Sequence, residues 1–161
     1  MILIGMVANN KDVQEIKRII ADDNIKIINI NGKSIKNIKN VKFDEIIVMK
    51  NIKLKKEEYK YMNDIIVNTK YMIVNADMEI DFLKELKIQK PIKLITYGFN
   101  SKATITISSI KEEKMMICVQ RNIKKGNDEI IEAKEVEINA PKSKKTYTNL
   151  IIFITKELHN L

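Results

Sequence analysis

The chain has 161 residues, which is the length of one ordinary domain and enough to bury a core without disulfides or metals. Its net charge is +8, yet only two of its 29 basic residues are arginine and lysine is spread over every segment, which favours a charged, solvated surface over a nucleic-acid-binding face. The single cysteine, Cys118, excludes an internal disulfide and indicates a cytoplasmic setting, and no apolar run reaches the length of a membrane span.

In the first hundred residues, short Ile/Val-rich runs alternate with segments whose apolar residues recur at helical spacing. Runs without polar alternation are typical of parallel strands that are covered on both faces. The first helical segment places Val13, Ile16 and Ile20 on one face, as expected of a helix that lies on a sheet. The predicted strands are 2–7, 25–30, 43–49, 71–74 and 92–97, and the predicted helical segments are 12–21, 34–38, 55–68 and 80–86.

The pattern changes after residue 100, where apolar and polar residues alternate with a period of two. This alternation predicts an antiparallel meander with a turn at Gly126-Asn127 and a helix after it. The predicted strands are 103–110, 115–121 and 130–138, and the predicted final helix is 146–158. We therefore expect a single α/β domain with a Rossmann-like, mainly parallel sheet and flanking helices over residues 1–100, and antiparallel hairpins with a C-terminal helix over residues 101–161.

Two predicted strands end in polar turns that form a recognisable series. The strand at 71–74 runs into Asn75-Ala76-Asp77, and the strand at 92–97 runs into Thr96-Tyr97-Gly98. With the hairpins and the helix that opens near Asn149, this order resembles the second half of the central domain of Mur ligases over about residues 71–158. Those enzymes are ATP-dependent amide ligases of bacterial cell-wall precursor synthesis, so the resemblance implies their central-domain fold.

The same resemblance places the family's phosphate loop on Gly5 to Asp12, where its residues are altered. Gly5 and Lys11 match the first Gly and the Lys, but Asn10 replaces the second Gly and Asp12 replaces the hydroxyl residue. Glycines let backbone N–H groups converge on phosphate oxygens, and the hydroxyl ligates Mg²⁺. A carboxylate at position 12 instead repels phosphate. We therefore expect no ATP binding in the family's manner.

Other parts of the ligase machinery are also altered. The family's adenine-holding pattern matches only at Asn149, because Lys145 and Thr146 replace its His and first Asn. No segment of the 161 residues matches the family's metal ligands or its partner domains. With one cysteine and one histidine, His159, the chain has no credible Cys/His pair or zinc site. We expect no catalytic residues, no metal and no cofactor.

The polar turns nevertheless form a candidate ligand-binding edge, because open α/β sheets bind ligands at the carboxyl ends of their strands. The candidate residues are Asn75, Asp77, Tyr97, Gly98, Asn100, Ser101, Lys102 and Asn149. The alternative is structural: Tyr97 packs, Gly98 permits a turn, and Asn100 and Ser101 cap backbone groups. Residues 31–34, Asn-Gly-Lys-Ser, spell the end of a phosphate loop, but the upstream glycine is missing and a turn between strand and helix is favoured.

These observations leave three hypotheses about function. The first is a non-catalytic Mur ligase-like protein with a binding, scaffolding or regulatory role related to the cell envelope. The second is a small-molecule or nucleotide-binding protein that uses the sheet edge at Asn75, Asp77 and Tyr97. The third is a basic nucleic-acid-associated module. For partners we expect another protein or self-association, for which an unpaired strand at the edge of the meander is one route; we do not expect a membrane, a nucleic acid or a nucleotide.

Overall fold

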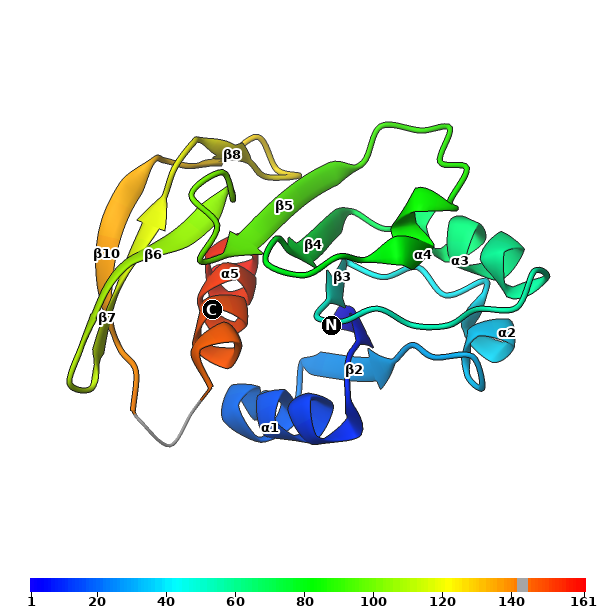
Figure 1. Ribbon diagram of the computed structural model, residues 1–161, viewed down its shortest axis with the longest axis horizontal. Coiled ribbons are helices and arrows are strands. Elements are labelled where there is room, and N and C mark those ends of the chain that lie inside the picture. Colours follow the sequence, from blue (N-terminus) through cyan, green and yellow to red (C-terminus); the bar gives the residue numbers. More distant parts are fainter. Residues whose placement is uncertain (142–144) are drawn as a thin grey trace. The chain divides into compact units, whose positions relative to one another are not determined.

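The computed structural model describes residues 1–141 and 145–161 (Figure 1). It comprises two compact units, Met1–Leu94 and Ile95–Leu161. The boundary lies close to residue 100, where the sequence pattern changes. Of the helices in the described residues, none has both the length and the apolar character that crossing a lipid bilayer requires.

The first unit alternates strands and helices, as the sequence predicts. Its strands are β1 (Ile2–Val7), β2 (Ile25–Asn29), β3 (Glu45–Val48) and β4 (Tyr71–Asn75), and its helices are α1 (Asn10–Ile20), α2 (Ile35–Ile38), α3 (Glu58–Val67) and α4 (Asp81–Lys84). The strands are parallel and lie in the order β4-β3-β1-β2. All four residues of β3 and all five of β4 are buried, which explains why these runs show no polar alternation.

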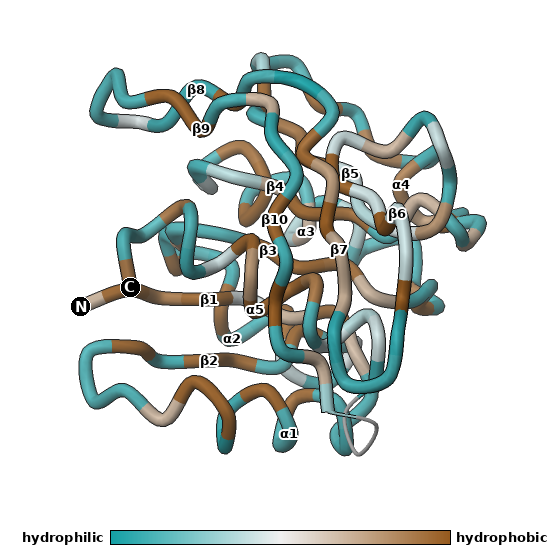
Figure 2. Tube along the Cα trace, turned by 90° about the vertical axis from the view of Figure 1, so that its left-hand side faces the viewer, coloured by the Kyte–Doolittle hydropathy of each residue, from teal (hydrophilic) through white to brown (hydrophobic). Residues whose placement is uncertain are grey.

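Helices contribute apolar side chains to two separate faces of this sheet. On one face α1 buries Val13 and Ile16, in agreement with the predicted stripe. On the other, Ile35 of α2 joins a core cluster with Met62 and Ile65 of α3 and with strand residues. Figure 2 shows α1 alternating between hydrophobic and hydrophilic residues, while β2 is mainly hydrophobic.

Gly5 lies inside β1, where the core packs most closely against the backbone. A Cβ atom at this position would lie 2.6 Å from Ile30 Cδ1, 3.2 Å from Phe43 Cδ1 and 3.3 Å from Ile46 Cγ1. All three neighbours are almost completely buried. The glycine therefore serves the packing of β1 against this cluster.

The second unit begins within β5 (Lys93–Gly98) and contains the antiparallel strands. Its other elements are β6 (Ile105–Lys111), β7 (Lys114–Val119), β8 (Ile123–Lys124), β9 (Ile130–Ile131), β10 (Lys134–Asn139) and the helix α5 (Thr146–His159). The strands lie in the order β10-β7-β6-β5, with β8 and β9 in a separate hairpin. β6, β7 and β10 are antiparallel, whereas β6 runs parallel to β5. The predicted fold class is thus confirmed: α/β, with a parallel sheet, flanking helices, an antiparallel meander and a final helix.

The prediction of one continuous strand at 130–138 is wrong. Its first part, β9, pairs with β8, while its second part, β10, pairs with β7. Between them the Ala133 N–H donates to Asn122 Oδ1 at 2.8 Å, so a side chain replaces a strand partner and the chain bends. The periodicity continues through this bend because Ile131 of β9 is buried and Val136 and Ile138 of β10 are half-buried, while the residues between them are exposed.

A polar cluster joins the β8–β9 hairpin to the end of α5. Lys125 is only 7 % exposed, and its Nζ pairs with Glu129 Oε2 at 3.2 Å and donates to Asn160 Oδ1. Asn160 Nδ2 donates to the same carboxylate at 3.2 Å, and Asn160 ends α5 in the left-handed conformation with φ 56°. Hydrogen bonds from Asn127, Asn160 and Lys125 lower the pKa of Glu129.

We expect replacement of Gly5 by alanine to destabilise the protein by about 1–3 kcal/mol, because overpacking outweighs the roughly 0.5–1 kcal/mol that alanine gains over glycine in a strand. Ile30→Val removes the atom that the new Cβ would meet and alone costs about 0.5–1.5 kcal/mol. In urea unfolding, the free energy of unfolding that the double variant loses should be smaller than the sum of the losses in the two single variants. Strict additivity would show that the contact between positions 5 and 30 is unimportant.

The Glu129 cluster predicts a pH-dependent contribution to stability. Because the pKa of Glu129 in the folded state lies below its ordinary value of 4.5, the stabilisation is fully present above that pH and is lost as the pH falls through the lowered pKa. Glu129→Gln should therefore lower the melting temperature near neutral pH, and the difference from the natural protein should shrink on acidification. Glu132→Gln, directly after the same hairpin, is the control and should change neither the melting temperature nor its pH dependence. Equal effects of the two substitutions would contradict the prediction.

Candidate functional site

The connection between β1 and α1 is too short for a phosphate loop. β1 ends at Val7 and α1 begins at Asn10, so only Ala8 and Asn9 lie between them. Of the residues aligned with the loop, Gly5 belongs to the strand, whereas Asn10, Lys11 and Asp12 form the first turn of α1. A phosphate loop needs a longer, glycine-rich connection whose N–H groups surround the phosphates.

The order of the parallel strands creates a switch point beside β1. β2 and β3 lie on opposite sides of β1. The connection after β1 therefore leads to one side of it, and the connection after β2 leads back to the other side. In open α/β sheets, ligands bind at the carboxyl ends of the strands at such a point. Here Lys50, which follows β3, donates from Nζ to Asn9 Oδ1 at 2.7 Å, and Asn9 Nδ2 donates to Asp12 Oδ2 at 3.3 Å.

Next to this switch point lies a hollow of about 540 Å³, which we call the carboxyl-edge hollow. Its size is within the range of small-molecule sites. The segments that follow β1, β2 and β3 all contribute to it, because parallel strands bring their carboxyl ends to one edge. The lining residues are Asn10, Asn31, Gly32, Lys33, Lys53, Lys55 and Glu58.

Local hydrogen bonds shape the wall of the hollow that follows β2. Asn31 Oδ1 accepts the N–H groups of Lys33 and Ser34 at 2.9 and 3.1 Å, and Ser34 Oγ donates to the Asn29 carbonyl oxygen at 2.9 Å. These bonds form an Asx-type turn between β2 and α2. Residues 31–34 are therefore a turn, as favoured from the sequence, and the turn presents Gly32 and the exposed Lys33 to the hollow.

The charge of the hollow is positive, since three lysines face one glutamate. Lys33, Lys53 and Lys55 are exposed, whereas Glu58 is half-buried at the start of α3. Glu58 Oε2 accepts the Lys55 N–H at 2.7 Å, which fixes the carboxylate against the helix N-terminus. Three lysine ammonium groups beside a single carboxylate leave the hollow with net positive charge, and ammonium groups hold an anion by charge and hydrogen bonding.

The side-chain amides of Asn29 and Asn10 form a further polar contact beside the hollow, at the start of α1. Asn29 Nδ2 donates to Asn10 Oδ1 at 2.7 Å, which connects the end of β2 to the start of α1. Asn29 Oδ1 is buried and accepts no hydrogen bond from the described residues. A buried acceptor without a protein donor needs a water molecule or another polar group beside it. Of the described residues, no three His, Cys, Asp or Glu side chains lie close enough together to hold a metal ion.

The sequence-predicted residues after β4 do not line this hollow. Asn75 is 2 % exposed and its Oδ1 accepts the Asp77 N–H at 2.9 Å, so it closes the turn that follows the strand. Asp77 itself is exposed. The turn after β4 and the hollow both follow the carboxyl ends of parallel strands, but the hollow lies at the ends of β1, β2 and β3. The basic run after β3, with Lys50, Lys53 and Lys55, is the signal that could have located it.

In the second unit, the predicted residues of β5 and its turn have structural contacts. Tyr97 is fully buried, and its ring meets that of Tyr147 edge to face with centroids 6.1 Å apart. Asn100 Oδ1 accepts the Lys102 N–H at 2.9 Å, and the Ser101 carbonyl oxygen accepts a hydrogen bond from Gln120 at 2.7 Å. These contacts agree with the structural alternative for the segment.

Further bonds close this turn and hold the start of α5. Thr96 and Thr104 exchange hydrogen bonds between the backbone N–H of each and the hydroxyl of the other, at 3.3 and 2.9 Å. This closure lets β6 start parallel to β5 after a short connection. Asn149, in the first turn of α5, is 6 % exposed, and its backbone N–H donates to the Lys145 carbonyl oxygen at 3.2 Å.

Comparison with known proteins provides no relative from which a function could be transferred. No protein-family model matches the chain, and no curated protein matches it in sequence. The site must therefore be interpreted from its own residues and geometry.

Gly98 provides a test of the structural interpretation of the β5 turn. Its φ is 147°, a conformation that side-chain-bearing residues rarely adopt, so Gly98→Ala should destabilise the protein by about 1–3 kcal/mol. The control is Gly32→Ala, whose Cβ would meet only Glu58, at 3.5 Å or more. It should change stability by no more than about 0.5 kcal/mol. Similar losses for both variants in denaturant unfolding would show that the φ of Gly98 is not the cause.

Proposed function

We propose that the protein is a non-catalytic binding protein that holds a small anionic ligand, a phosphate- or carboxylate-bearing metabolite, in the carboxyl-edge hollow. One observation carries the proposal: the segments after three adjacent parallel strands converge on a hollow of about 540 Å³ in which three lysines face one glutamate. The position next to a switch point is where open α/β sheets bind ligands. The buried Asn29 Oδ1, which accepts no hydrogen bond from the described residues, lies beside Asn10 and supports a polar occupant nearby.

The lining residues favour binding over chemistry. Lysines and amides contact an anion through charge and hydrogen bonds, but nucleophilic catalysis needs a nucleophile beside a base that is itself oriented by a third group. Within the lining, Glu58 is the one carboxylate, and it already accepts the Lys55 N–H. The two-residue connection between β1 and α1 supports a binding mode that differs from the phosphate loop.

Descent from the central domain of Mur ligases is part of this proposal. Its support is the position of the two polar motifs: Asn75 ends β4 and Gly98 ends β5, so both turns fall where the resemblance requires them. A central domain that has lost its phosphate loop and kept a polar sheet edge would be retained for binding, in a regulatory or scaffolding role at the cell envelope.

Thermal unfolding with a panel of anions tests the proposal. Inorganic phosphate, pyrophosphate, citrate and ATP, with and without Mg²⁺, are the probes. A ligand at a hundred times its Kd stabilises the native state by about 2.7 kcal/mol and raises the melting temperature accordingly. At least one probe should do so for the natural protein. The effect should be lost in Lys33→Gln/Lys53→Gln/Lys55→Gln.

A matched variant distinguishes the hollow from general charge. Lys87, Lys90 and Lys111 are exposed lysines outside the hollow, so replacing all three by glutamine removes the same charge. This control should keep the response to the anion. Equal losses in both triple variants, or no response to any probe, would contradict the proposal. Stabilisation by ATP and Mg²⁺ that depends on Lys11 would instead indicate a working phosphate site at the start of α1.

A further inference from the structure

Among the strands of the described residues, β2 pairs on one edge only, and its other edge has a defined hydrogen-bonding pattern. β2 is the last strand in the order of the sheet, and its paired edge lies against β1. Along that paired edge the Ile2 N–H donates to the Asn24 carbonyl oxygen and the Ile30 N–H donates to the Met6 carbonyl oxygen, both at 2.7 Å. In a parallel ladder, bonding residues alternate with outward-facing ones. The peptide groups of Ile25, Ile27 and Asn29 therefore point away from β1.

Two of these outward groups are already used within the chain. The Ile25 N–H donates to the Asp22 carbonyl oxygen at 3.0 Å, and the Asn29 carbonyl oxygen accepts the Ser34 hydroxyl at 2.9 Å. In the part of the chain that the structure describes, four outward groups have no such partner: the Ile25 C=O, the Ile27 N–H, the Ile27 C=O and the Asn29 N–H. Unsatisfied edge groups of this kind are templates for pairing with another strand.

We propose that β2 pairs antiparallel with β2 of a second copy of this chain, centred on Ile27. In that register the two Ile27 residues exchange N–H···O=C bonds, and each Asn29 N–H donates to the Ile25 C=O of the other copy. All four unpaired outward groups of each copy are then hydrogen-bonded. The Ile25 N–H and the Asn29 C=O, which are bonded within the chain, are not needed for this pairing. A shift by two residues in either direction loses this match.

The side chains along β2 are compatible with the same register. Lys26 falls opposite Ile28 of the second copy, so no like charges are directly opposed, whereas a shift by two residues towards the start of the strand would place Lys26 against Lys26. Antiparallel pairing also brings the start of one strand next to the end of the other. The acidic turn with Asp22 and Asp23 therefore lies near Lys33 of the second copy, which gives complementary charges at both ends.

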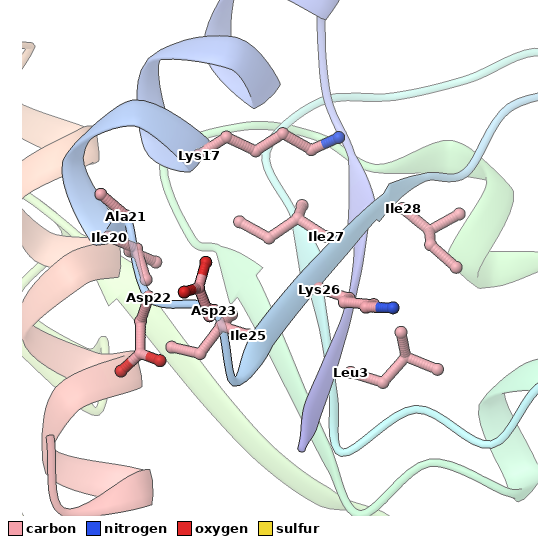
Figure 3. A pocket seen from close by; sticks show the side chains of 10 residues that line it. All are labelled: Leu3, Lys17, Ile20, Ala21, Asp22, Asp23, Ile25, Lys26, Ile27 and Ile28. Carbon is pink, nitrogen blue, oxygen red and sulfur yellow. The ribbon is translucent and has the colours of Figure 1, made fainter.

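A hollow beside β2 provides apolar surface for the contact. It measures about 630 Å³, and Figure 3 shows its side chains around β2 and the end of α1. Its apolar residues are Leu3, Ile20, Ala21, Ile25, Ile27 and Ile28. The cations Lys17 and Lys26 lie among them together with Asp22 and Asp23, so the surface carries both signs of charge. A mixed surface of this kind fits a second copy of itself.

The other outer strand, β10, lacks this complementarity. The Ala140 N–H donates to the Glu113 carbonyl oxygen at 2.7 Å, and the register with β7 then directs the peptide groups of Glu135 and Glu137 outward. Antiparallel self-pairing of β10 about Val136 would set Glu135 against Glu137 of the second copy, and pairing about Glu137 would oppose the two Glu137 residues. Like charges that are directly opposed are destabilising. Self-pairing of β10 in either of these registers is thus disfavoured, whereas the register of β2 opposes no like charges.

Sedimentation and disulfide trapping test the proposal. Sedimentation equilibrium from micromolar to millimolar protein should show a concentration-dependent increase from 18.7 kDa towards twice that mass. In a Cys118→Ser background, Lys26→Cys/Ile28→Cys places two cysteine pairs at non-hydrogen-bonded positions, where Cβ atoms approach within about 4.5–5.5 Å, close to disulfide geometry. Mild oxidation should convert this variant to a covalent dimer, and Lys26→Cys alone should remain mostly monomeric.

The controls separate register, folding and ligand binding. If Lys26→Cys alone cross-links as fast as the double variant, the strands pair in a shifted register and the proposed one is wrong. A monomeric mass at all concentrations, in variants whose circular dichroism matches that of the natural protein, would also overturn the proposal. The trapping variants leave the residues of the carboxyl-edge hollow unchanged, so failure here would not count against the proposed function.

Discussion

Close packing around β1 is the constraint on which the first unit depends. β1 has a strand on each side, and at Gly5 the side chains of Ile30, Phe43 and Ile46 approach so closely that no Cβ fits without displacement. Ile30 follows β2, Phe43 precedes β3 and Ile46 belongs to β3, so one glycine lets three segments meet over the backbone of β1. The same arrangement aligns the ends of β1, β2 and β3, and thereby creates the polar edge that forms the carboxyl-edge hollow.

This packing gives the altered motif at the start of the chain a physical meaning. In a phosphate loop, glycines serve a ligand because backbone N–H groups must approach phosphate oxygens. In this protein Gly5 serves the core, and α1 starts so soon after β1 that Asp12 occupies its first turn, where a carboxylate interacts favourably with the helix dipole. Local stability therefore explains the residues from 5 to 12 without reference to a nucleotide.

The sequence predicted the regular elements well, because their periodicity reflects which side chains are buried. It did not predict β8 and β9, since two-residue strands have no period, nor the bend before β10, which depends on the hydrogen bond from Ala133 to Asn122. The sequence pointed to the carboxyl ends of the parallel strands but not to the residues that line the carboxyl-edge hollow. Convergence of Lys33, Lys53 and Lys55 follows from strand order, and strand order arises from long-range pairing that a local pattern does not contain.

The turn that follows β2 also limits how far a sheet can grow from this edge. The Ser34 hydroxyl donates a hydrogen bond to the Asn29 carbonyl oxygen, and the Ile25 N–H donates one to the Asp22 carbonyl oxygen. The outward backbone groups at the two ends of β2 are therefore already used within the chain. A two-fold contact of this kind is closed, because each copy uses its only β2 edge and offers no second one for a third copy. Many proteins protect such edges from fibre formation with charge or proline. Here two local hydrogen bonds limit the edge to four backbone groups, which suffice for one short two-fold pairing but not for a longer ladder.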